Sequence, residues 1–107
     1  MIDWDRVKDL RNDVGAEDFD DIVEIFLDEV ADTAAKLRDA DTADLEMLAH
    51  ALKNNALNLG LSQLAGLCQE GETLARSGQA VDTPRIIDVL DTSLTEFKAR
   101  LPAMLAD

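Results

Sequence analysis

The feature that most constrains the fold is an apolar stripe at helical spacing, repeated along the chain. Between residues 17 and 39 apolar side chains recur every three or four positions, and four other segments share this spacing. Helix-ending or helix-starting residues separate the stripes, namely Gly15, Gly60, Gly78 and Pro84. The pattern predicts helices over residues 2–13, 17–39, 42–59, 62–77 and 83–101, the last extending to 105 if it passes Pro102.

Brief links between these segments leave few ways to pack them. We predict an all-α fold, an antiparallel up-and-down four-helix bundle. The first helix would be a short N-terminal lid, with Trp4 covering one end of the core. A chain of 107 residues suits one domain over residues 1–107, and the abundance of Ala and Leu with no tyrosine favours helix over sheet.

Charge narrows the classes of partner. Ten basic and 23 acidic residues give a formal net charge of −13, so the surface repels nucleic acid and anionic membranes. No apolar run approaches the roughly 20 residues that span a bilayer, and the N-terminus lacks a signal-peptide pattern. The single cysteine, Cys68, excludes an internal disulfide. We therefore expect a cytoplasmic monomer.

The only histidine, His50, lies in the middle of the predicted 42–59 helix. At about 100° per residue it points roughly 160° away from the apolar face, toward solvent. Met47 and Leu57 are apolar residues on the same outer side, and Ile25 lies off the stripe of the preceding helix. Apolar residues around an exposed histidine indicate a docking surface.

A carboxylate can reach this histidine from the next helix. The short link at Gly60 makes segments 42–59 and 62–77 an antiparallel hairpin. In such a hairpin, a residue ten before the turn lies level with one about ten after it. Glu72 can therefore approach His50.

Four interpretations of His50 remain open from the residues alone. It is an incidental surface histidine, a ligand of a metal with Cys68 and Glu72, a partner of Cys68 in a catalytic dyad, or a nucleophile toward phosphoryl groups. The metal and dyad interpretations need an accessible thiolate, whereas Cys68 falls on the apolar face. A nucleophile needs less: a neutral imidazole, Glu72 to fix its tautomer, and Lys53 one turn away to offset phosphate charge.

A known family has a similar pattern of residues. The histidine-containing phosphotransfer (HPt) domain of phosphorelays resembles this chain over nearly its whole length, in the residues Ala49-His50-Ala51-Leu52-Lys53, Gly60-Leu61, Leu64, Cys68 and Glu72. The resemblance implies a phosphocarrier without turnover of its own. His50 would accept a phosphoryl group from a receiver aspartate or from an ordinary or hybrid histidine kinase, and pass it to a response-regulator receiver domain. Lys53 would be the lysine of the motif, and Glu72 would hydrogen-bond the imidazole.

The resemblance also implies that no cofactor is bound by this chain, because the partner receiver domain supplies Mg²⁺. One departure stands beside the histidine. Asn54 and Asn55 occupy positions where the family has glycine and then a small residue. Asn54 would lie in the path of an incoming receiver. The alternative function is a non-catalytic adaptor that binds a partner through Met47, Leu57 and Ile25.

Overall fold

The computed structural model describes residues 2–105 and, of Thr42, the backbone alone. Within this range the chain folds into helices and short links, with no strand. The predicted all-α class is confirmed. The first four helices begin and end within two residues of their expected bounds, and the last passes Pro102 and ends one residue before 105. The helices are α1 (Trp4–Val14), α2 (Ala16–Asp39), α3 (Thr42–Asn58), α4 (Ser62–Arg76) and α5 (Thr83–Met104).

Aspartates start three of the helices. The side chains of Asp3, Asp41 and Asp82 each accept a hydrogen bond from the backbone N–H three residues later, which satisfies one of the free donors of the first turn. Pro84 follows Asp82 in the first turn of α5, as the sequence predicts. Pro102 does not end α5, which continues to Met104.

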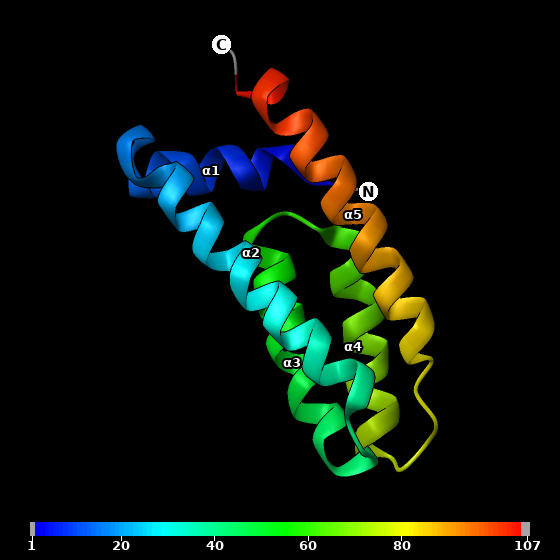
Figure 1. The fold of residues 1–107 in the computed structure, drawn as a ribbon. Helices are drawn as coiled ribbons and strands as arrows, with labels where there is room; N and C mark the ends of the chain where they lie inside the picture. The colour runs from blue at the N-terminus through cyan, green and yellow to red at the C-terminus, as the bar shows by residue number, and fades with distance from the viewer. Residues whose placement is uncertain (1, 106–107) are drawn as a thin grey trace.

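The helices make an elongated molecule of 46 × 21 × 18 Å. In Figure 1, α3 and α4 lie side by side, with α2 and α5 alongside them and α1 across one end. The most extensive contact is between α3 and α4. None of the helices within residues 2–105 combines the length and apolar character that a membrane crossing requires.

The apolar stripes meet in one core. Every helix contributes buried side chains, and Trp4 of α1 stacks on Phe97 of α5 with ring centroids 5.7 Å apart. The completely covered side chains include Val30, Leu52, Leu59, Leu61, Leu64, Cys68 and Phe97.

The turn between α3 and α4 is held by the N-terminal segment. Gly60 adopts φ +72°, which side-chain-bearing residues rarely adopt, and a Cβ there would meet the carbonyl of Asp3. The Asp3 N–H donates to the Gly60 carbonyl at 2.6 Å. Arg6 Nη2 donates to Asn58 Oδ1 at 3.3 Å. These contacts fix the turn that sets the register of α3 against α4.

Candidate functional site

His50 lies in the middle of α3, and its side chain is 53% exposed. The residues on either side of it in sequence, Ala49 and Ala51, are small. Leu48, Ala49 and Leu52 are buried, so this part of α3 is anchored to the core while His50 faces outward. The predicted orientation of His50 is confirmed.

The hairpin does bring Glu72 to His50. Glu72 Oε2 lies 2.8 Å from His50 Nδ1, and Glu72 Oε1 accepts a hydrogen bond from Lys53 Nζ at 2.8 Å. Glu72 is only 5% exposed. The hydrogen bond from Lys53 and then that from His50 lower the pKa of Glu72 below its ordinary value, although burial acts to raise it.

This hydrogen bond decides which nitrogen of the imidazole is free. An ionised carboxylate only accepts hydrogen bonds, so the nitrogen beside it must carry the proton. His50 Nδ1–H therefore donates to Glu72. In the neutral imidazole Nε2 then has a free lone pair, on a side chain that is half exposed.

Lys53 is engaged within the site. Its Nζ also donates to Gln69 Oε1 at 2.9 Å, and its side chain is only 17% exposed. Two of its three protons therefore point to Glu72 and Gln69 of α4. Lys53 thus neutralises Glu72 and ties α3 to α4.

Arg76 and Glu46 complete the cluster, and neither is among the site residues predicted from the sequence. Arg76 Nη2 donates to Glu72 Oε2 at 3.4 Å, and Arg76 Nε donates to Glu46 Oε1 at 2.9 Å. Their positions carried a signal, because Arg76 lies four residues after Glu72 and Glu46 four residues before His50. We call His50, Lys53, Glu72, Arg76 and Glu46 the His50 cluster.

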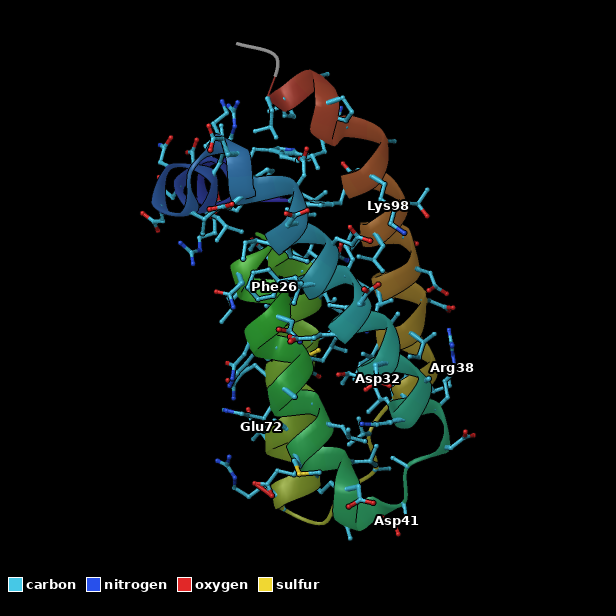
Figure 2. All side chains as sticks on the ribbon, turned by 60° about the vertical axis from the view of Figure 1, so that its left-hand side comes forward. Phe26, Asp32, Arg38, Asp41, Glu72 and Lys98 are labelled. Carbon is cyan, nitrogen blue, oxygen red and sulfur yellow. The ribbon has the colours of Figure 1, made fainter. Side chains whose placement is uncertain are left out.

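Figure 2 labels one member of this cluster, Glu72. The Glu72 side chain lies along the α3–α4 pair, on the opposite side of the view from Arg38 at the end of α2. All five residues of the cluster come from α3 and α4. The two helices with the most extensive mutual contact thus supply every member of the site.

Cys68 does not take part in this chemistry. The thiol is fully buried, and burial raises its pKa to about 12, despite the nearby Lys53. A Cys68–His50 dyad is therefore wrong, because no thiolate is available. Among residues 2–105, no three His, Cys, Asp or Glu side chains are grouped as a metal would require, so His50, Cys68 and Glu72 do not form a ligand set.

The predicted docking residues Met47 and Leu57 lie on α3 with His50, and Ile25 lies on α2. Met47 is 64% exposed, and Leu57 and Ile25 are about half exposed. Asn54 is exposed, whereas Asn55 is half-buried. Large exposed apolar side chains of this kind suit contact with a protein partner.

Comparison with known proteins gives the family of this chain. The family model of the Hpt domain matches residues 21–100, which include all five residues of the His50 cluster. The chain belongs to the Hpt domain family. The resemblance to HPt domains is thereby confirmed, and with it a place in phosphorelay signalling.

Individual relatives of this Hpt chain are named as phosphorelay proteins. It is 29% identical to the phosphorelay protein LuxU of Vibrio vulnificus over 96 residues, which cover 85% of this chain and 84% of that protein. It is 32% identical to the phosphorelay protein LuxU of Vibrio cholerae over 85 residues, which cover 76% and 75%. No solved structure matches this chain significantly.

Proposed function

We propose that His50 is the residue that carries the phosphoryl group in this Hpt phosphocarrier. The observation that supports this most strongly is the hydrogen bond from His50 Nδ1 to the buried Glu72 carboxylate. It leaves Nε2 as the nucleophile and keeps the ring in one orientation. The family and the two LuxU relatives, named as phosphorelay proteins, give the class of reaction.

In the proposed reaction the Nε2 lone pair attacks the phosphorus of a receiver acyl phosphate. The Nε2–P bond forms as the P–O bond to the aspartate breaks, and the aspartate carboxylate leaves with the bonding electrons. The ring becomes positive and keeps its Nδ1 proton, and Glu72 offsets that charge. The receiver would supply Mg²⁺, so this chain would need no cofactor of its own. Because it is itself phosphorylated and then dephosphorylated, it acts as an intermediate and not as an enzyme with its own turnover.

The partners would be response-regulator receiver domains and, upstream, an ordinary or hybrid histidine kinase. Met47, Leu57 and Ile25 would meet the receiver, and Asn54 would contact it beside the reacting histidine. The adaptor alternative is not favoured, because it gives the shared Glu72 carboxylate no role. The net charge of −13 supports a cytoplasmic monomer that avoids nucleic acid and anionic membranes.

For the architecture we propose an antiparallel up-and-down bundle of α2 to α5 with α1 as a lid, forming one domain over residues 1–107. The short links at residues 40–41 and 59–61 favour antiparallel neighbours. The stacking of Trp4 on Phe97 favours a covering role for α1.

The test is transfer of label from a phosphorylated receiver, in a panel of receiver domains. We expect acid-labile, alkali-stable label on the wild type and none on His50→Gln. A matched control is Gln69→Ala, which leaves both His50 and Glu72 in place and should still accept label. Label retained on His50→Gln would contradict the assignment of His50.

A further inference from the structure

The charges of the His50 cluster cancel before phosphorylation. Lys53 and Arg76 are positive, and Glu46 and Glu72 are negative. A phosphoryl group carries about −1.5 to −2 charges at neutral pH, and the positive ring offsets only part of this charge, so a cation that leaves its carboxylate would stabilise the phosphorylated histidine. Within the cluster this cation can only be Lys53, which pairs with Glu72, or Arg76, which pairs with Glu46 and Glu72.

Lys53 is the less available of the two. Its side chain is 17% exposed, and it holds both the buried Glu72 and Gln69 by hydrogen bonds of 2.8 and 2.9 Å. If Lys53 turned outward, the Glu72 carboxylate would lose its shortest ion pair while remaining buried. Lys53 is therefore better suited to hold Glu72 than to follow the phosphoryl group.

Arg76 has the opposite properties. Its side chain is 62% exposed, and its contact with Glu72 is long, at 3.4 Å. It shares the oxygen Oε2 with His50 Nδ1, so the guanidinium lies on the histidine side of the carboxylate, whereas Lys53 occupies the other oxygen. Its firm contact is with Glu46, at 2.9 Å on the surface.

We propose that Arg76 is the cation that pairs with the phosphoryl group on His50, and that Glu46 competes with the phosphoryl group for Arg76. This inference rests on the proposed function of His50. Surface ion pairs are weak, so Arg76 can leave Glu46 at small cost. A guanidinium then gives a phosphoryl group two parallel hydrogen bonds. Glu46, one turn from His50, also repels the phosphoryl group directly.

The experiment uses the whole chain and needs no cognate receiver. Potassium phosphoramidate serves as the donor: Nε2 attacks its phosphorus, the P–N bond to the amino group breaks, and ammonia leaves. The second pKa of the phosphoryl group on His50 is then followed by ³¹P NMR against pH. A neighbouring cation lowers this pKa and a neighbouring anion raises it.

We expect Arg76→Gln to raise the phosphoryl pKa by about half a unit and Arg76→Lys to restore most of the difference. Glu46→Gln should lower the pKa, and in the Arg76→Gln background the same substitution should have less than half that effect. The ion pair of Arg100 and Glu96 on α5 has nearly the same exposure as that of Arg76 and Glu46. Arg100→Gln and Glu96→Gln are therefore matched controls and should leave the phosphoryl pKa unchanged.

Two outcomes overturn the inference separately from the proposed function. A phosphoryl group on His50 whose pKa is the same in wild type and Arg76→Gln excludes Arg76 as its partner. Equal effects of Glu46→Gln with and without Arg76 exclude the competition. Failure to phosphorylate His50 at all, by phosphoramidate or by any receiver, would instead contradict the proposed function itself.

Discussion

Cys68 and Glu72 lie one turn apart on α4, and both are buried, yet their ionisation is opposite. Burial raises the pKa of the Cys68 thiol to about 12, whereas the pKa of Glu72 is lowered. Lys53 is near both groups, but of these two it donates a hydrogen bond to Glu72 alone, and His50 donates a second hydrogen bond to Glu72. Burial therefore keeps the Cys68 thiol protonated, whereas at Glu72 the direct hydrogen bonds from Lys53 and His50 outweigh the effect of burial and keep the carboxylate charged.

This difference in ionisation indicates that Cys68 has a structural role and Glu72 a functional one. Cys68 packs as a small apolar side chain in the core. Glu72 is an ionised acceptor fixed from two sides, and this is what allows it to hold the ring of His50.

The largest expected effect comes from removing the principal partner of Glu72. Lys53→Met leaves a buried carboxylate without its strongest hydrogen bond, and we expect the melting temperature to fall by about 5 °C or more. The double variant Lys53→Met/Glu72→Leu replaces the pair by apolar groups and should recover at least half of the loss. Thermal unfolding followed by circular dichroism measures both. A melting temperature unchanged in Lys53→Met would mean that the ion pair does not support Glu72.

A smaller effect is expected in the acid stability of the protein. Because the pKa of Glu72 in the folded state lies below its ordinary value of 4.5, its stabilising contribution is complete above pH 4.5. That contribution is lost as the pH falls through the lowered folded value. Urea unfolding between pH 6 and pH 3 should therefore show a steeper loss of stability for wild type than for Glu72→Gln. Parallel curves would show that the pKa of Glu72 is not lowered.

The smallest effect should follow from changing Cys68. Cys68→Ala removes one buried sulfur atom, and we expect a loss of about 1 kcal/mol in the free energy of unfolding. Phosphorylation of His50 should be unchanged, because the thiol is neutral and buried in the core. Denaturant unfolding and label transfer on the same preparation check both points. A large loss of transfer without a comparable loss of stability would give Cys68 a role in the site.

Much of the fold could be predicted because its signals are local. Gly15, Gly60 and Pro84 mark helix ends, and the spacing of apolar residues gives the core faces. The approach of Glu72 to His50 could also be predicted, since a tight turn at Gly60 sets the register of the hairpin. Here the local pattern and the tertiary arrangement agree.

The contacts of Lys53, Arg76 and Glu46 could not be predicted, because they depend on which rotamers these long side chains adopt. Lys53 was expected to face the phosphoryl group, and only the packed structure shows it joined to Glu72 and Gln69. Arg76 and Glu46 are surface residues with long flexible side chains. Their contact joins two helices, and spacing along one helix does not reveal it.

The most direct test of the central claim is to determine which nitrogen of His50 carries the phosphoryl group. In protein with ¹⁵N-labelled histidine, phosphorus–nitrogen coupling identifies the bonded atom. We expect the phosphoryl group on Nε2, because Nδ1–H is held by the Glu72 carboxylate. A phosphoryl group on Nδ1 would contradict the role of Glu72 as the group that fixes the reacting nitrogen.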